Sequence, residues 1–335
     1  MRKNSSTKVA RSPLTLELRP IAPFRLDLTA WALRRRPENL IDRWDGETYR
    51  RVLLVSGHPT EITVSQHGPE QSPLLEVNLS AAGCVPHARE EVTGLLRGML
   101  GLQADLKPFY RLVSHDRKLA CLAEKYRGLK PVRFPTVFEA LTNAIACQQF
   151  TITAGLQLLN RLARLGSVVI ETATGPAFGF PEPSDFLRIR PQTFRSLGFS
   201  GQKTRAFRDL GAGILSGRTD LRRLMNLDNQ AAKDYLQTLT GVGRWTAEYV
   251  LLRGLGRLDV FPGDDVGARN GLTKWLQRRK PMDYESVGRA LAPWQPYTGF
   301  IYFHMLLESL DASGRLHSSQ GPVLPVSQKH ADLDS

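Results

Sequence analysis

Apolar and polar positions alternate along much of the first third of the chain. Three segments in which every second residue is apolar predict strands of a half-buried antiparallel sheet; they are Tyr49–Val55, Glu61–Ser65 and Leu74–Leu79. Asp45-Gly46 predicts a tight turn before the first strand, and residues 86–100 have helical spacing. We therefore expect a small α+β unit over residues 23–107. Residues 1–22 show no periodicity and predict a flexible basic arm.

Helical spacing replaces this alternation after residue 107. Thr136 and Glu139 form a capping-box pattern ahead of an amphipathic run with Phe138, Leu141 and Ile145 on one face. A Gly/Pro-rich loop is expected at 175–183, and helices near 191–197, 202–215, 229–239, 244–255, 266–278, 285–292 and 297–310. We divide this mainly α-helical region into two lobes, 108–133 with 258–312 and 134–257, followed by a flexible tail over 313–335.

Composition and charge narrow the classes of function. The 335 residues are 41% hydrophobic and 23% charged, as in ordinary globular proteins, and no apolar run reaches membrane-spanning length. The net charge of +13 makes a polyanion the first partner to consider. Cys84, Cys121 and Cys147 are too few and too far apart for a disulfide framework or a four-cysteine metal site, which favours a reducing intracellular location.

A glycine-bounded turn between two helical segments is the first candidate for nucleic-acid binding. In the sequence around Gly241, Val242 and Gly243, two glycines permit a tight turn, and a helix beginning near Arg244 would place backbone N–H groups beside it. Such a turn can bind one phosphate. A glycine-terminated helix followed by another helix explains the same residues without a ligand. The basic stretch 187–225 likewise fits either a surface along a phosphate backbone or a solvated helical face.

An acidic pair about twenty residues further on is the candidate for catalysis. Asp264 and Asp265 follow Pro262-Gly263 and precede a predicted helix, a place where helix-capping carboxylates are common. One of them could instead point into a cleft between the lobes. A carboxylate there would stabilise a cationic sugar or orient a water molecule.

These motifs, taken in order, resemble the helix-hairpin-helix DNA glycosylase superfamily. The resemblance rests on Ala144-Ile145-Ala146-Cys147-Gln148-Gln149, the basic helices, Leu239-Thr240-Gly241-Val242-Gly243-Arg244-Trp245-Thr246-Ala247 and then the acidic pair. Within the superfamily the chain is most similar to the DNA-3-methyladenine glycosylase II family, whose extra N-terminal α+β domain is matched by Trp44-Asp45-Gly46-x-x-Tyr49-x-Arg51 and Leu75-x-Val77-x-Leu79-Ser80. The likeness extends over about residues 23–312.

The resemblance implies roles for individual residues. Asp265 takes the catalytic position, with Asp264 as its helix-capping neighbour, and Trp245 stands where bifunctional relatives carry a Schiff-base lysine. A monofunctional enzyme without lyase activity is therefore implied. The candidate base pocket consists of Trp245, Tyr249, Tyr302 and Phe303, although an ordinary core position explains Tyr249 and Phe303 equally well. Aromatic faces suit a cationic alkylated base, whose bond to the sugar is already weakened.

DNA contacts and ions follow from the same resemblance. The expected DNA-binding residues are Gln148, Gln149, Lys203, Gly241, Val242, Gly243, Arg244 and Thr246. The backbone carbonyls of Gln237, Leu239 and Val242 match those that hold a structural Na⁺ or K⁺ in relatives, and no other cofactor and no iron–sulfur cluster is expected. The chain departs from the family pattern at Thr240, which replaces a proline, at Gln149, which replaces an inserted leucine, and at Phe303, which replaces a tryptophan.

The expected function is thus a monofunctional DNA glycosylase that hydrolyses the N-glycosidic bond of alkylated purines of the 3-methyladenine and 7-methylguanine type in duplex DNA. It would flip the base into an aromatic pocket during base excision repair. A glycosylase of the same fold for oxidised or deaminated bases remains open, as does a non-catalytic helix-hairpin-helix DNA-binding protein. We expect a monomer that binds damaged double-stranded DNA and no membrane, and that is cytoplasmic and associated with the nucleoid.

Overall fold

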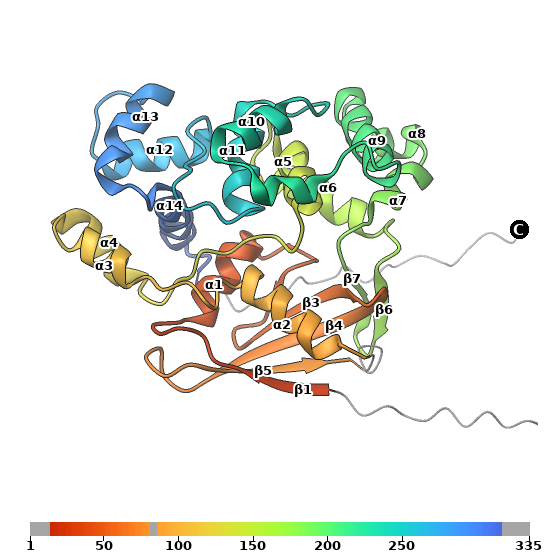
Figure 1. Cartoon of the computed structure of the whole chain (residues 1–335), viewed down its shortest axis with the longest axis horizontal. Coiled ribbons are helices and arrows are strands. Elements are labelled where there is room, and N and C mark those ends of the chain that lie inside the picture. The colour runs from red at the N-terminus through yellow and green to blue at the C-terminus, as the bar shows by residue number, and fades with distance from the viewer. Residues whose placement is uncertain (1–13, 81–85, 317–335) are drawn as a thin grey trace, which may run out of the picture.

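The computed structural model describes residues 14–80 and 86–316 of the chain. It contains an antiparallel sheet at one end and a larger helical region at the other (Figure 1). The expected tail lies outside the described residues from position 317 onward, as does the first part of the expected arm. No helix among the described residues is long and apolar enough to cross a membrane.

The sheet has five strands in the order β1-β5-β4-β3-β2. They are β1 (Leu14–Leu18), β2 (Arg43–Trp44), β3 (Thr48–Val55), β4 (His58–His67) and β5 (Leu74–Leu79). Alternate side chains of β3, β4 and β5 are buried, which confirms the period-two prediction. The prediction of a flexible arm is wrong from Leu14 onward, because this segment pairs with Leu79 and its neighbours on β5.

Two helices accompany the sheet. The first, α1 (Leu26–Arg34), lies between the sheet and the helical region, and α2 (Ala88–Met99) packs on β3 (Figure 1). A fold of this kind, with an N-terminal α+β unit ahead of a mainly helical region, is the predicted one.

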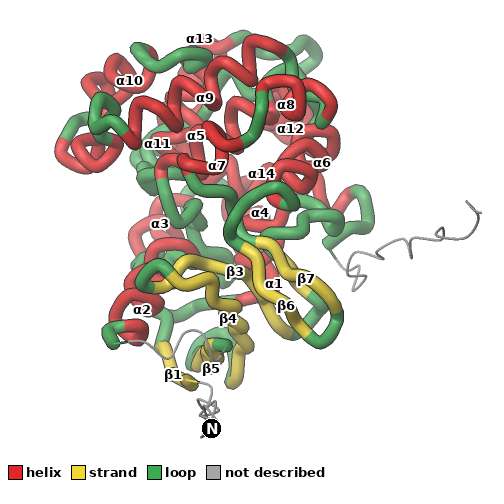
Figure 2. Tube along the Cα trace, turned by 90° about the vertical axis from the view of Figure 1, so that its right-hand side faces the viewer, coloured by secondary structure: helices red, strands yellow, loops and turns green. Residues whose placement is uncertain are grey.

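The predicted loop at 175–183 is only partly correct. Its first residues belong to a hairpin of β6 (Val169–Thr172) and β7 (Gly175–Phe178), whose edge packs beside β3 and β4 (Figure 2).

The helical region begins with α3 (Lys107–Val113) and α4 (Arg117–Lys125), which the sequence pattern did not resolve as separate helices. Phe109 of α3 packs edge-on against Phe300 of α14, so the segment before residue 133 contacts the C-terminal helix. The remaining helices are α5 (Val137–Cys147), α6 (Ile152–Ala163), α7 (Pro183–Arg188), α8 (Pro191–Ser196), α9 (Gly201–Leu215), α10 (Asn229–Gln237), α11 (Arg244–Arg253), α12 (Val266–Trp275), α13 (Tyr284–Leu291) and α14 (Thr298–Ala312).

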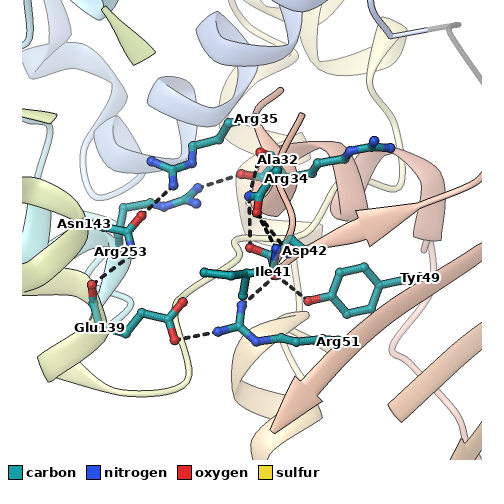
Figure 3. Close-up of polar contacts among 11 residues, drawn as sticks. Ala32, Arg34, Arg35, Ile41, Asp42, Tyr49, Arg51, Glu139, Asn143 and Arg253 are labelled. Atoms are coloured by element: carbon teal, nitrogen blue, oxygen red, sulfur yellow. Dashed lines mark hydrogen bonds and ion pairs between the residues drawn. The ribbon is translucent and has the colours of Figure 1, made fainter. Parts of the chain in front are cut away.

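A buried polar network joins the sheet to the helices (Figure 3). Arg51 of β3 forms ion pairs with Asp42 at 2.6 Å and with Glu139 of α5 at 2.5 Å. The expected capping box is therefore half correct: Thr136 caps α5 by accepting the N–H of Glu139, but the Glu139 side chain crosses to the sheet unit. Burial raises the pKa of Glu139 to about 7, and Arg51 opposes that rise.

Candidate active site

The glycine-bounded turn lies between α10 and α11, as expected. Gly241 has a φ of +80°, and a Cβ there would lie 2.9 Å from the Cβ of Ala206, so both conformation and space require glycine. Gly243 is the exposed N-cap of α11, and no side chain covers the N–H groups by capping. The turn thus keeps the donor-rich helix start that phosphate binding needs. Val242, by contrast, is buried.

A second turn, between α5 and α6, is fastened to this hairpin. The Nε2 atom of Gln148 donates to the carbonyl of Gly241 and to the hydroxyl of Thr246, both at 2.8 Å. From the other side, Lys203 Nζ donates to the carbonyls of Ala146 at 2.9 Å and Gln148 at 2.7 Å. Burial lowers the pKa of Lys203. Lys203 and Thr246 are 8% and 1% exposed, so both side chains brace the turn instead of facing a ligand.

The tip of the α5–α6 turn presents Gln149 and Phe150. Gln149 adopts the left-handed conformation with φ of +59° and is exposed. Phe150 is 47% exposed, although it is large and apolar, and Lys203 Nζ lies 4.0 Å from its ring centroid. Phe150 was not among the predicted site residues, because a single phenylalanine after two glutamines carries no pattern that distinguishes a surface ring from a core ring.

Asp265 is both the N-cap of α12 and the acceptor of two side-chain donors. Its Oδ1 atom accepts the N–H of Ala268 at 2.9 Å. Its Oδ2 atom accepts the Nε1–H of Trp245 at 3.3 Å and the hydroxyl of Tyr302 at 3.1 Å. Donors from three elements therefore fix the orientation of this half-buried carboxylate.

Asp264 does not cap the helix, and the expectation that it would is wrong. Its Oδ2 atom pairs with Arg244 at 2.6 Å, and the Arg244 guanidinium lies 3.8 Å from the ring centroid of Tyr284. Hydrogen bonding to Asp264 raises the pKa of Arg244. The exposed Arg244 thus has a carboxylate partner already, and a DNA phosphate would compete with it.

The α5–α6 turn, Trp245 of α11, the start of α12 and one face of α14 line a cleft of about 810 Å³. Of the predicted site residues, it brings together Gln148, Gln149, Trp245, Asp264, Asp265 and Tyr302. Other lining residues were not predicted, and these are Arg36, Cys147, Phe150, Thr151, Ile152, Val266, Gly267, Ala268, Met305, Leu306 and Ser309. Arg36 comes from the N-terminal unit, so the sheet-bearing part of the chain contributes a wall.

Tyr249 and Phe303 lie behind the cleft, not in its lining. Tyr249 is 5% exposed and its ring packs against Trp245 with centroids 5.5 Å apart, so it supports the tryptophan from within the core. Phe303 is fully buried and lies against the guanidinium of Arg253 at 5.2 Å. The sequence does not reveal which face of these helices lines the cleft, because most residues of α11 and α14 are buried.

The neighbouring titratable groups favour a neutral aromatic wall. Burial, and secondarily the Asp265 carboxylate, raise the pKa of Tyr302 well above its usual range. Tyr302 therefore remains a hydrogen-bond donor at neutral pH. His304, on the same helix, is buried with Nδ1 2.9 Å from the carbonyl of Phe300, and burial lowers its pKa to about 4. His304 is therefore hydrogen-bonded within its own helix and is not part of the cleft lining.

Within residues 14–80 and 86–316, no group of three or more His, Cys, Asp or Glu side chains could hold a metal ion. The three carbonyls proposed for a monovalent cation lie at the end of α10 and in the turn after it. The Leu239 carbonyl accepts the Val242 N–H at 3.1 Å, which leaves it one lone pair. This donor chemistry fits Na⁺ or K⁺, and that ion stays a prediction.

The chain matches the family described as "HhH-GPD superfamily base excision DNA repair protein" over residues 142–296, which include both turns and the acidic pair. It is 29% identical over 262 residues to "DNA-3-methyladenine glycosylase 2" of Escherichia coli K12, covering 77% of this chain and 84% of the relative. It is 25% identical over 217 residues to "DNA-3-methyladenine glycosylase" of Bacillus subtilis 168, covering 65% and 72%.

The fold has counterparts among solved structures. The 3-methyladenine DNA glycosylase of Archaeoglobus fulgidus superposes with a TM-score of 0.77 at 24% identity, covering 89% of this chain and 99% of that one. A structure described as MBOgg1 in complex with a low-affinity DNA ligand gives 0.71 at 21% identity, covering 89% and 96%. At these identities the likeness concerns the fold alone.

The family match over residues 142–296 and the fold, with a glycine hairpin followed by a cleft carboxylate, point to one class: this part of the chain is similar to the helix-hairpin-helix superfamily of base excision DNA repair proteins. Within that superfamily the chain is similar in sequence to proteins named DNA-3-methyladenine glycosylase, which confirms the resemblance predicted from the sequence.

Proposed function

We propose that this protein is a monofunctional glycosylase that hydrolyses the N-glycosidic bond of alkylated purines in duplex DNA. One observation carries the proposal: Asp265 is held by Trp245, Tyr302 and a helix N-terminus at the edge of an aromatic cleft. An oriented carboxylate beside aromatic faces suits a reaction in which positive charge passes from the base to the sugar.

Asp265 would act when the bond between base and sugar stretches. A purine alkylated at N3 or N7 is cationic and departs without much protonation, so the enzyme must mainly stabilise the developing oxocarbenium ion. The carboxylate does this as a fixed anion, or it polarises the attacking water. Trp245 and Tyr302, both in the lining, provide faces on which a cationic ring is favourable.

The protruding α5–α6 turn supports base flipping. A flipped nucleotide leaves a gap in the stack, and apolar side chains often fill such gaps. Phe150 is exposed beside Gln149 on a turn that Gln148 and Lys203 hold firmly. We assign the filling of this gap to Gln149 and Phe150 together. Phe150 supplies the apolar surface that the neighbouring glutamine lacks.

Backbone binding would use the N–H groups at Gly243 and the start of α11. The exposed cations of the basic stretch then extend the contact along the phosphates; they are Arg188, Arg190, Arg195, Arg205, Arg218, Arg222 and Arg223. The bound form is a monomer on damaged double-stranded DNA.

The same site supports the absence of lyase activity. A lyase needs an amine that forms a Schiff base with the sugar. No lysine lines the cleft in the described part of the chain, and Trp245 stands at the position that bifunctional relatives give to lysine. Lys203, which braces the α5–α6 turn, donates hydrogen bonds to two carbonyls.

A lesion panel tests the proposal. Duplexes containing 3-methyladenine, 7-methylguanine, hypoxanthine or 8-oxoguanine are incubated with the protein, and released bases and strand breaks are measured before and after alkali. We expect release of the methylated purines, with breaks only after alkali. Release of 8-oxoguanine or hypoxanthine alone would favour a glycosylase for oxidised or deaminated bases. DNA binding without any release would favour a non-catalytic protein.

A further inference from the structure

Arg35 crosses from the N-terminal unit into the core of the helical region. It is the C-cap of α1, with a left-handed φ of +62°, and its N–H donates to the carbonyl of Trp31 at 2.8 Å. The residue is only 5% exposed. Its guanidinium lies among α5 and α11, well separated along the chain from its own helix (Figure 3).

Two neutral side chains hold the guanidinium. Nη2 of Arg35 donates to Asn143 Oδ1 at 2.6 Å, and Nη1 donates to the hydroxyl of Tyr249 at 3.1 Å. Asn143 is fixed in turn, because its Nδ2 donates to the Glu139 carbonyl at 3.1 Å. The flat face of the guanidinium lies 5.4 Å from the ring centroid of Phe134. Contacts with Asn143, Tyr249 and Phe134 therefore fix the orientation of the Arg35 guanidinium.

This arrangement continues to the catalytic carboxylate through two aromatic rings. The Tyr249 ring packs on Trp245 at 5.5 Å between centroids, with planes 37° apart. Trp245 in turn donates its Nε1–H to Asp265 at 3.3 Å. Each contact constrains the next side chain, so the position of the guanidinium limits where the Trp245 indole can lie.

Attachment of the two parts of the chain does not account for this residue. Arg51 already joins them with two carboxylates, which compensate its charge. Arg35 has no carboxylate partner among the ion pairs of the described residues, and its Nε atom is buried without a hydrogen bond. The hydrogen bonds of Arg35 go to Asn143 and Tyr249 and not to a carboxylate that would fasten the two parts, which points to a role in holding the groups it contacts.

We propose that Arg35 is a positioning residue for base release: by fixing the Tyr249 hydroxyl, it orients Trp245 and thereby Asp265. The inference rests on the proposed glycosylase function of the same cleft. It gives the N-terminal α+β unit a part in catalysis, since that unit supplies the cation that sets the geometry of an aromatic wall.

The test compares three single variants and the Arg35→Met/Tyr249→Phe double variant by two measurements, with Tm recorded for each variant as a measure of stability. Arg35→Met keeps much of the stem and removes both hydrogen bonds, while Tyr249→Phe removes only the hydroxyl that Arg35 contacts. Glu139→Gln is the matched control, because it weakens the buried network between the same two parts without touching Tyr249. The first measurement is single-turnover base release together with the Kd for abasic-site DNA. The second is the ¹⁹F resonance of 5-fluorotryptophan at position 245, assigned with Trp245→Phe.

We expect Arg35→Met and Tyr249→Phe to slow base release by about 10- to 100-fold, as small misplacements of reacting groups do, while the Kd changes little. Both should shift the resonance of Trp245, and the double variant should be no slower than Arg35→Met. Glu139→Gln should lower Tm but leave the rate and the resonance unchanged.

An unchanged Trp245 resonance in both variants would overturn the proposal, as would a loss of rate in Glu139→Gln equal to that in Arg35→Met. Should Arg35→Met fail to fold, Tyr249→Phe alone decides the question. If the wild-type protein releases no base, the proposed function fails, whereas the resonance still decides whether Arg35 positions Trp245.

Discussion

Tyr302 donates its hydroxyl proton to Oδ2 of Asp265 over 3.1 Å, although the two residues lie 37 positions apart on different helices. The bond limits rotation of the Asp265 carboxylate. Burial raises the pKa of the Tyr302 phenol and so keeps it protonated. We expect Tyr302→Phe to slow base release by roughly 10-fold, since a hydrogen bond to a charged group contributes about 1.5–3 kcal/mol and part of it acts in the transition state. Single-turnover kinetics measure the effect.

Tyr126→Phe is the matched control for that variant. Its hydroxyl also donates to a carboxylate, that of Glu308 at 2.7 Å, but neither residue lines the cleft. It should lose some stability and keep the wild-type rate. Equal rates in Tyr302→Phe and the wild type would show that the hydroxyl does not orient Asp265.

Asp265→Asn separates catalysis from binding. Asparagine caps helices as well as aspartate does, so α12 should begin at the same residue. Its amide nitrogen cannot accept from Trp245 and Tyr302, so Tm should fall modestly. The fixed anion is lost, however, and we expect base release to fall by ~100-fold or more. Affinity for abasic-site DNA, measured by fluorescence anisotropy, should stay close to that of the wild type. Normal release by this variant would remove Asp265 from the mechanism.

The sequence predicts some parts of the structure better than others. Strands and motifs with a local pattern were predictable, and the packed faces of buried helices were not. The strands Thr48–Val55 and Leu74–Leu79 were predictable because one of their faces is solvated and alternation is visible. Leu14–Leu18 alternates as well, but these five residues follow a basic terminus without a turn signal and were assigned to the arm. Its pairing with β5 depends on a partner about sixty residues away, which no local pattern contains.

The site shows the same division. Asp265 and the hairpin could be located from motifs, since glycine at φ of +80° and a capping carboxylate leave a local signature. The face of an apolar helix could not: Tyr302 reaches the cleft while its neighbour Phe303 is fully buried. Arg35 was missed because its contacts lie more than 100 residues along the chain, and an arginine run by itself predicts an exposed surface.

Lys203 should contribute to DNA binding without contacting a phosphate. It donates to the carbonyls of Ala146 and Gln148, so Lys203→Met should loosen the turn that carries Phe150 and weaken binding. The slope of log K against log salt concentration should stay unchanged, because no phosphate contact is lost. Arg205→Met, on the exposed side of the same helix, should reduce that slope by about 0.9 if Arg205 binds a phosphate. A reduced slope in Lys203→Met would contradict the bracing role.

His304 predicts a specific pH dependence of stability. Its ring is 1% exposed, and Nδ1 donates to the Phe300 carbonyl, so the folded protein holds the neutral tautomer. Burial lowers its pKa from 6.5 to about 4. Between these two values the unfolded chain binds a proton that the folded chain does not, so the free energy of unfolding falls as the pH falls through this window. Between about pH 7 and about pH 5 this group alone should lower it by ~2 kcal/mol. His304→Gln cannot titrate, so urea unfolding at the two pH values should show a correspondingly smaller loss in the variant. The same loss in both proteins would mean that His304 is accessible to protons in the folded state.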